Sequence, residues 1–307
     1  MRGALAGALL WLAAAPALGG GTLVVVTTSA DLKALVEAVG GPRVRVVSLA
    51  PPLHDPHSVE LKPGALAELR AAALLVRIGL DHEPWLARPL RAVGDARLLP
   101  GGAADLDVSR GIALLDAETP RVRSERGVHV HGFGNPHYWL DPENARPITE
   151  HIQGALARLS PGDAALFEAN RAQFLRMLDA GLTRWRAALA PYQGTRVVVA
   201  HETWPYFARR FSLTVVAALE PTPGVPPSAA YLAALTGRMK NSGVRLIIAE
   251  PSTSASLVAQ VAARAEARAV ILVPSVGGDP AARDYLSLFD VNVARLAAAL
   301  AAAPAAR

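Results

Sequence analysis

The chain has 307 residues, of which 51% are hydrophobic and none is cysteine, and its formal net charge is +5. This length suits two domains or one large domain with a sizeable core, and the lack of cysteine excludes a disulfide framework. The positive charge comes mostly from arginines dispersed along the chain, so it does not form the clustered basic patch of a nucleic-acid-binding protein, and we expect no nucleic-acid partner.

The first residues are typical of a secretory signal peptide. A positive start at Met1 and Arg2 precedes a short apolar run and the small-residue cleavage site at residues 15–17. The run is shorter than the roughly 20 residues that a membrane span needs. We therefore expect residues 1–17 to be a cleavable signal peptide. Since no cysteine follows that could carry a lipid, we expect a periplasmic protein without a lipid anchor.

The next part of the chain predicts an N-terminal α/β lobe over residues 18–160. Its apolar patterns give strands with a helix between the first two, in a β-α-β order that is typical of parallel sheets. The predicted strands are residues 23–27, 44–49, 72–78 and 96–99, and the predicted helix is residues 31–39.

A long helix is predicted over residues 163–189. Apolar residues recur there at spacings of three to five, no proline interrupts them, and Pro161 and Pro191 bound the stretch. At about 1.5 Å per residue such a helix is roughly 40 Å long. We therefore expect residues 161–190 to be a stiff linking helix between two lobes. Upstream of it, Asp141 followed by Pro142 is typical of a helix start.

The remaining residues, 191–307, predict a C-terminal α/β lobe. Strands and helices alternate along it, which favours a second parallel sheet with covering helices. The predicted strands are residues 196–200, 213–217, 244–249 and 269–273, and the predicted helices are residues 204–211, 229–239 and 254–265.

Three histidines stand beside the predicted elements and far apart in sequence. His57 follows the second strand, His137 precedes the helix start at Asp141, and His201 directly follows the strand at residues 196–200. Ligands of open α/β sheets bind outside the carboxyl ends of strands, so a cleft would hold His57 and His201. In a chain without cysteine these imidazoles suit zinc, copper, nickel or iron better than calcium or magnesium.

Four strings carry a specific resemblance. They are Asp-Pro-His at residues 55–57, Gly-Leu-Asp-His-Glu-Pro-Trp at 79–85, Asn-Pro-His-Tyr-Trp-Leu-Asp-Pro at 135–142, and His-Glu-Thr-Trp-Pro-Tyr-Phe at 201–207. In order and spacing the chain resembles the cluster A-I family of metal-binding solute receptors of ATP-driven importers, the zinc and manganese receptors.

The resemblance implies two α/β lobes joined by one rigid helix, with the metal in the cleft between them. It implies that His57 and His137 are ligands from the first lobe and His201 from the second. Manganese-selective relatives usually carry a carboxylate at the position of His201, so three imidazoles favour zinc. The expected fold class is thus α/β with an inter-lobe metal site.

The fourth ligand departs from the family pattern. Relatives often place an aspartate where this chain has Pro274. Asp279, a few residues further in the same loop, is the expected replacement. Glu250 at the end of its strand and a bound water are the alternatives, and an aspartate beside two glycines is also an ordinary turn residue.

The other histidines and the nearby tryptophans have weaker roles. His129 and His131 lie in a short loop and either pass metal toward the cleft or are merely exposed. Three further histidines are expected not to be ligands: His54, His82 and His151. Three tryptophans are expected to pack beneath the site loops, where a dry shell strengthens a metal site: Trp85, Trp139 and Trp204.

The expected function is a high-affinity Zn²⁺ receptor, not an enzyme, which delivers zinc to an ABC permease in the inner membrane. We expect a monomer, with a zinc-donating chaperone as an additional partner. A manganese or iron receptor of the same fold and a metal-binding adhesin are the alternatives. A zinc hydrolase is a remote one, since His129 and His131 resemble a His-x-His motif but no His-Glu-x-x-His helix is present.

Overall fold

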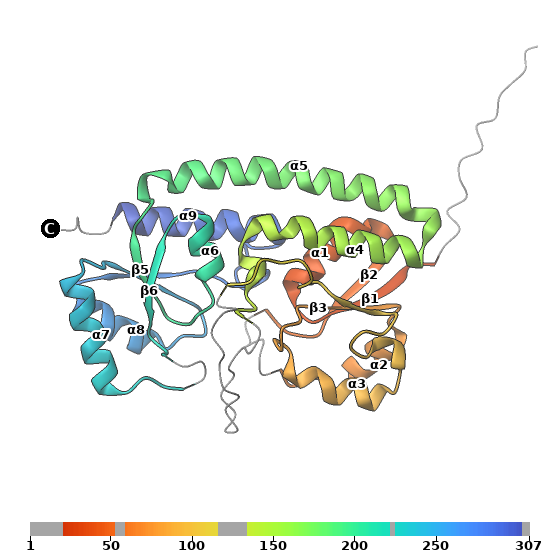
Figure 1. Ribbon diagram of the computed structural model, residues 1–307, viewed down its shortest axis with the longest axis horizontal. Coiled ribbons are helices and arrows are strands. Elements are labelled where there is room, and N and C mark those ends of the chain that lie inside the picture. Colours follow the sequence, from red (N-terminus) through yellow and green to blue (C-terminus); the bar gives the residue numbers. More distant parts are fainter. Residues whose placement is uncertain (1–20, 53–58, 116–133, 222–224, 303–307) are drawn as a thin grey trace, which may run out of the picture.

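The computed structural model describes residues 21–52, 59–115, 134–221 and 225–302, and these form two lobes, each built on a parallel sheet (Figure 1). The first sheet has the order β2-β1-β3-β4 and the second the order β6-β5-β7-β8. The strands are β1 (Leu23–Thr27), β2 (Val44–Ser48), β3 (Leu74–Arg77), β4 (Asp105–Asp107), β5 (Arg196–Val199), β6 (Thr214–Ala218), β7 (Leu246–Ala249) and β8 (Arg268–Ile271). The predicted fold class is confirmed, and both sheets reverse their strand order beside the first strand of the lobe.

Helices cover both faces of each sheet, because alternate residues of the strands point to opposite sides and both sides are apolar. Val25 of β1 faces α1 while Val26 faces α2 and α3, and Val197 and Val198 of β5 divide in the same way. The covering helices are α1 (Ala30–Gly40), α2 (Gly64–Ala71), α3 (Ala87–Val93), α4 (Ala145–Leu159), α6 (Pro205–Arg210), α7 (Ala229–Asn241), α8 (Ala255–Ala265) and α9 (Tyr285–Ala301).

The predicted long helix is α5 (Ala164–Leu189), which has 26 residues and crosses both lobes along one side (Figure 1). It packs on α1 and α4 of the first lobe and on α9 of the second. Its buried Trp185 packs against Phe289 of α9, with the rings tilted by 37°, and donates a hydrogen bond from Nε1 to Asp290. In the described part of the chain, no helix has both the length and the apolar character to cross a membrane.

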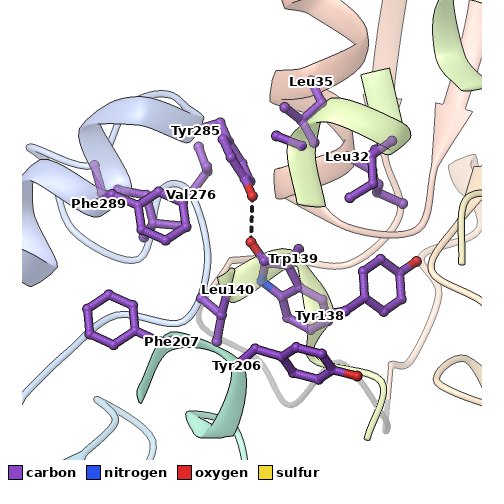
Figure 2. Packing of buried hydrophobic residues seen from close by; sticks show 14 of the residues in the cluster. Leu32, Leu35, Tyr138, Trp139, Leu140, Tyr206, Phe207, Val276, Tyr285 and Phe289 are labelled. Carbon is purple, nitrogen blue, oxygen red and sulfur yellow. Dashed lines mark hydrogen bonds between the residues drawn. The ribbon is translucent and has the colours of Figure 1, made fainter. Parts of the chain in front are cut away.

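The lobes share one hydrophobic core on the α5 side. A turn at Tyr138–Leu140 lies between α1 of the first lobe and α6 and α9 of the second (Figure 2). Tyr285 donates a hydrogen bond to the carbonyl oxygen of Trp139 at 2.5 Å, and Trp139 donates from Nε1 to the carbonyl oxygen of Pro274 at 3.0 Å. Satisfied polar groups inside a shared core favour one fixed arrangement of the two lobes.

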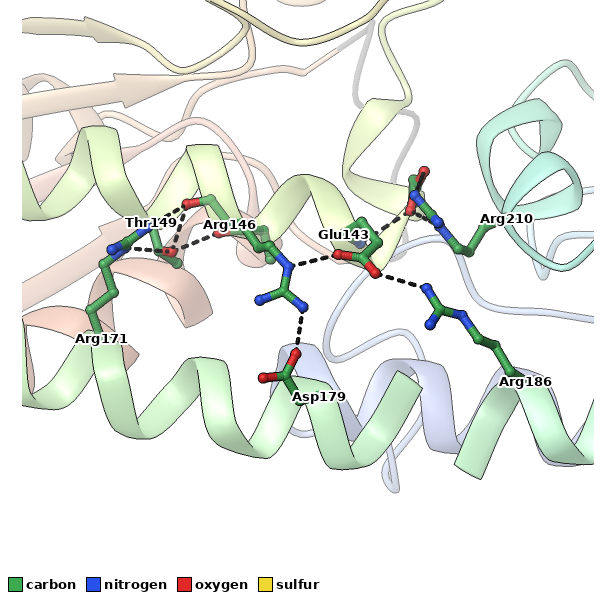
Figure 3. Close-up of polar contacts among 9 residues, drawn as sticks. Glu143, Arg146, Thr149, Arg171, Asp179, Arg186 and Arg210 are labelled. Atoms are coloured by element: carbon green, nitrogen blue, oxygen red, sulfur yellow. Dashed lines mark hydrogen bonds and ion pairs between the residues drawn. The ribbon is translucent and has the colours of Figure 1, made fainter. Parts of the chain in front are cut away.

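Charged groups continue this contact toward the surface. Asp141 accepts two hydrogen bonds from Arg210 of α6, at 2.6 and 2.9 Å, and it also caps the turn at Pro142–Asn144 that leads into α4. Glu143 pairs with Arg186 of α5 and with Arg146, which also pairs with Asp179 (Figure 3). The predicted cap at Asp141 is therefore confirmed, and its carboxylate also holds the second lobe.

The predicted strand at residues 96–99 is wrong. Residues Ala96–Leu98 form a short 3-10 helix, because the carboxylate of Asp95 accepts a hydrogen bond from the backbone N–H of Arg97 at 2.9 Å and starts a turn. The fourth strand is β4, whose sequence Asp-Leu-Asp has no apolar run. Its two aspartates instead pair with Arg77 of the neighbouring strand β3, which allows polar residues at the sheet edge.

Candidate metal centre

In the second lobe His201 lies between two carboxylates at the carboxyl ends of adjacent strands. The sheet order β6-β5-β7 places Glu220 after β6, His201 after β5 and Glu250 after β7. The Nδ1 atom of His201 is 3.4 Å from Oε2 of Glu220. Glu250 accepts hydrogen bonds from Nε1 of Trp204 at 2.6 Å and from Thr253 at 3.0 Å.

Burial raises the pKa of Glu250, while the nearby His201 lowers it. A cation bound at His201 would therefore be close to two carboxylates. Glu250 is held by hydrogen bonds and is buried, with 4% of the residue exposed. Glu220 is more open to solvent, with 36% of its side chain exposed. This end of the sheet has the acceptors and the negative charge that a divalent cation requires.

In the first lobe, Asn135 fixes the orientation of His137. Its Oδ1 atom accepts a hydrogen bond from the backbone N–H of His137 at 2.9 Å and lies 2.9 Å from the ring Nδ1. Its Nδ2 atom donates to the carbonyl oxygen of Glu202 at 2.8 Å. Because Oδ1 can only accept, Nδ1 of His137 carries the proton and Nε2 carries the lone pair through which an imidazole can bind a metal.

The structure brings His137 and His201 together across the two lobes. Their ring centroids are 5.8 Å apart and the rings are nearly perpendicular, at 83°. Two imidazoles that bind one zinc ion through nitrogens at about 2.0–2.1 Å in tetrahedral geometry have ring centroids about 5 Å apart. The separation of the two rings is therefore compatible with a shared metal.

The described part of the structure shows neither of the other predicted ligands in contact with His137 and His201. His57 lies outside the described ranges, as do His54, His129 and His131. The carboxylate of Asp279 pairs with Arg295 of α9 and accepts a hydrogen bond from the backbone N–H of Ala281 at 2.8 Å. Both contacts lower the pKa of Asp279. Within residues 21–52, 59–115, 134–221 and 225–302, no three or more His, Asp or Glu side chains form a group that could hold a metal.

Two of the three tryptophans pack as expected. Trp139 is 3% exposed and lies 5.3 Å from the ring of His137, and Trp204 is fully buried beside Glu250. Trp85 is half-buried against the outer core of the first lobe. The apolar shell around His137 and Glu250 excludes water from the polar groups there, which strengthens their interactions with charge.

Asn135 and Glu220 are the site residues that the sequence alone did not single out. Asn135 stands in the Asn-Pro-His string, two residues before His137, where a side-chain amide can reach the local backbone. Glu220 ends its strand in the way that Glu250 ends β7, so the same strand-end argument could have found it.

Comparisons with known proteins match most of the chain. A family model described as ZnuA, the periplasmic zinc-uptake complex component A, matches residues 25–299. The chain is 27% identical over 291 residues to the zinc-binding lipoprotein AdcA of Streptococcus pneumoniae, in a match that covers 90% of this chain and 55% of AdcA. It is also 27% identical over 297 residues to the high-affinity zinc uptake system protein ZnuA of Paracoccus denitrificans. That match covers 86% of this chain and 87% of the Paracoccus protein.

A solved structure has the same architecture. A crystal structure of ZnuA matches with a TM-score of 0.75 and 28% sequence identity, over 91% of this chain and 99% of that chain. The chain spans about half the length of AdcA, at 55%, and most of the length of the Paracoccus protein, at 87%.

Proposed function

The chain belongs to the family of periplasmic zinc-uptake components A, and on that premise we propose that it binds Zn²⁺ between its lobes and delivers it to a membrane ABC importer. Similar proteins are named for zinc binding and for high-affinity zinc uptake. The receptor role makes zinc a cargo, and we propose that the chain itself catalyses no reaction.

The observation that carries this proposal is the pairing of His137 and His201 across the lobes, 5.8 Å apart, with the Nδ1 atom of each ring directed to an oxygen of Asn135 or Glu220. A ring that donates from Nδ1 presents Nε2 to a metal, and such outer partners are typical of metal-binding histidines. Neutral imidazoles suit zinc better than manganese, which prefers oxygen ligands. We propose His57 as the third nitrogen ligand, on the resemblance of residues 55–57 to the family string.

The fourth position has two carboxylate candidates, and each already has partners. Asp279, the candidate from the sequence, would exchange its ion pair with Arg295 for the metal. Glu250 would give up the hydrogen bond from Trp204 or from Thr253. A water molecule needs neither exchange. The three histidines therefore define the site, and the fourth ligand adjusts to them.

We propose that the protein acts in the periplasm after removal of residues 1–17, and as a monomer. Its partners would be the permease of the importer and a zinc-donating chaperone. The family description places the family in the periplasm.

Metal analysis tests the function directly. Protein purified without added metal and then loaded should bind one zinc ion per chain, and a large excess of manganese should not displace it. His137→Ala should abolish this stoichiometric binding. His151→Ala, which changes a histidine within α4, is the matched control and should leave binding intact. Displacement of zinc by manganese at comparable concentrations would instead identify a manganese receptor.

A further inference from the structure

A strained turn in the first lobe lies beside His137. After β3 the chain turns back at Gly79, and the backbone N–H of His82 donates a hydrogen bond to the carbonyl oxygen of Gly79 at 2.9 Å. Leu80 and Asp81 at the centre of this turn have φ values of 56° and 57°. Non-glycine residues rarely adopt this left-handed conformation, and they keep it only where the surroundings impose it. A neighbouring group must therefore hold the turn.

The carboxylate of Glu83 holds this turn, residues 79–83, in place. Its Oε1 atom accepts hydrogen bonds from the backbone N–H of Ile78 and from the hydroxyl of Thr28, each at 2.6 Å. Its Oε2 atom accepts one from the backbone N–H of Gly79 at 3.1 Å. These donors lie at the carboxyl ends of β3 and β1, where the first sheet reverses its strand order. Glu83 thus joins the turn to the edge of the sheet at which ligands of α/β folds bind.

The turn is also bonded to the segment that carries His137. The hydroxyl of Tyr138 donates to the carbonyl oxygen of Ile78 at 2.6 Å, so Ile78 bonds to Glu83 through its N–H and to Tyr138 through its oxygen. Tyr138 is fully buried and directly follows His137 in the chain. Through Ile78, the carboxylate of Glu83 is therefore connected to the backbone beside His137.

His82 adds a packing contact to the ring of His137. It is 1% exposed, and its ring centroid lies 5.6 Å from that of His137, with the ring planes at 84°. The ring of Trp139 lies 5.2 Å from His82 and 5.3 Å from His137, so the three rings pack together. The hydrogen bond from Asn135 and this packing both limit rotation of the His137 ring.

We propose that Glu83 is a positioning residue for the metal centre, which acts through the turn and keeps the ring of His137 in the orientation that accepts zinc. This inference rests on the proposed function, in which His137 is a ligand. Glu83 acts from outside the ligand set, since its oxygens already accept three hydrogen bonds. A ligand that is oriented before the metal arrives binds more tightly than one that must be ordered on binding.

Glu83→Gln tests this role with little change in side-chain volume. The amide keeps one oxygen for Ile78 and Thr28, but it places an NH₂ group against the backbone N–H of Gly79. Two donors then face each other at the start of the strained turn, so the turn should leave its left-handed conformation. Thr28→Val removes only the hydroxyl donor and should have the same effect at smaller size, whereas Thr28→Ser keeps the donor.

Nitrogen NMR of the histidine rings in the metal-free protein measures the orientation. The wild type should show the proton of His137 on Nδ1, in slow exchange with water, because Asn135 accepts it. In Glu83→Gln this signal should weaken, and zinc affinity in competition titrations should fall about 10- to 100-fold, the usual loss for an outer partner of a metal-binding histidine. Thr28→Val should lower both by less, and Thr28→Ser should retain both.

Asp163→Asn is the matched control. The carboxylate of Asp163 accepts hydrogen bonds from Arg43 and Ser160 at the junction of α4 and α5, at the end of the first lobe that points away from the second (Figure 1). Its replacement should lower the free energy of unfolding, measured with urea, and leave both the ring signal and the zinc affinity unchanged.

An unchanged zinc affinity or an unchanged ring signal in Glu83→Gln would overturn the positioning role and leave the proposed function standing. An equal loss of affinity in Asp163→Asn would also overturn it, because lower stability alone would then explain the effect. A wild type that binds no zinc would overturn both proposals. If Glu83→Gln does not fold, the two variants of Thr28 decide by the same two measurements.

Discussion

His137 and His201 face each other across the lobes, but their surroundings differ. His137 is 3% exposed and is held by a neutral amide, Asn135, whose other end is fixed on the second lobe. The side chain of His201 is 21% exposed and faces a carboxylate, Glu220, which is itself partly exposed. The first lobe therefore offers a ring in a fixed orientation, while the second offers a partly exposed ring beside a carboxylate that attracts cations.

This difference indicates a division of tasks within one site. In the proposed site, the buried ring of His137 would set where the metal binds, because Asn135 determines its orientation before the metal arrives. The partly exposed ring of His201, beside the carboxylate of Glu220, would meet the metal from the solvent side. The asymmetry predicts that the two sides differ in rescue by added imidazole and in the effects of changing the outer partners Asn135 and Glu220.

The largest effect should come from removing either ring. His137→Gly and His201→Gly should each weaken zinc binding by on the order of 1,000-fold, or about 4 kcal/mol, because a direct ligand is lost. Added imidazole should restore binding in His201→Gly, whose site is open to solvent, and much less in His137→Gly, whose site is closed. Titration of zinc against a competing chelator, with and without imidazole, measures the loss of affinity and its rescue.

Equal rescue of the two variants would show that the rings are equally accessible and would remove the basis of the comparison. His151→Gly is the control for unspecific effects of imidazole, and its zinc affinity should be the same in both solutions.

A second test concerns the fixed position of the lobes, which the comparison requires. Asp31 of α1 is 1% exposed and accepts hydrogen bonds from the hydroxyl of Ser275 at 2.6 Å and the backbone N–H of Val276 at 2.9 Å, both in the second lobe. Burial raises the pKa of Asp31 from 3.8 to about 6. The folded protein thus binds this proton more tightly than the unfolded chain, and stability must depend on pH.

The stabilising contribution of protonated Asp31 is complete below about pH 3.8 and is lost as the pH rises to about 6. Over that window the free energy of unfolding of the wild type, relative to Asp31→Asn, should fall by about 3 kcal/mol. Urea unfolding of both metal-free proteins across the window measures it. A constant difference between them would mean that Asp31 titrates as an exposed carboxylate does.

A third test removes the side chain that holds His137 in its orientation. Asn135→Ala removes the acceptor for Nδ1 of His137 and leaves the carbonyl oxygen of Glu202 without this donor. Zinc affinity should fall about 10- to 100-fold, the usual loss for an outer partner of a metal-binding histidine. Asn135→Asp keeps the acceptor but places a carboxylate against the carbonyl oxygen of Glu202, so it should recover only part of the affinity. Competition titrations compare the three proteins.

The smallest effect should come from the side of His201, where the neighbouring Glu220 is partly exposed. Glu220→Gln keeps an oxygen near His201 but removes its charge, so zinc affinity should fall less than about 10-fold. Because Glu220 is partly exposed, the difference from wild type should shrink at high salt, where exposed charges are screened. The Asn135→Ala defect should not change with salt. A salt-independent loss in Glu220→Gln would indicate that the carboxylate acts through a hydrogen bond alone.

Most of the fold could be predicted because its signals are local. Strands such as β1 and β5 are rich in valine, which is buried on both faces of the sheet. The length of α5 follows from apolar residues that recur at helical spacing without a proline between them. Strand β4 could not be predicted, since its aspartates belong in a strand only through their ion pairs with Arg77, a residue distant in sequence.

For the site, too, some features could be predicted from the sequence and others depend on tertiary contacts. The strand-end position of His201 predicted that it lies at a cleft, and the family resemblance implied that His137 approaches it from the first lobe. The structure brings the two rings together. The partners of Asp279 and the place of His82 depend on tertiary structure. Arg295 reaches Asp279 from another helix, and His82 is buried by a turn with positive φ at Leu80, a residue type that does not indicate such a conformation. Ligation by His57 and Asp279 remains a prediction.

A crystal structure of the zinc-loaded protein tests the central claim most directly, with the metal located by anomalous scattering at the zinc edge. We expect one zinc ion between the lobes, with ring nitrogens of His57, His137 and His201 at about 2.0–2.1 Å from it. A zinc ion bound elsewhere, or one in the cleft that either His137 or His201 does not contact, would contradict it.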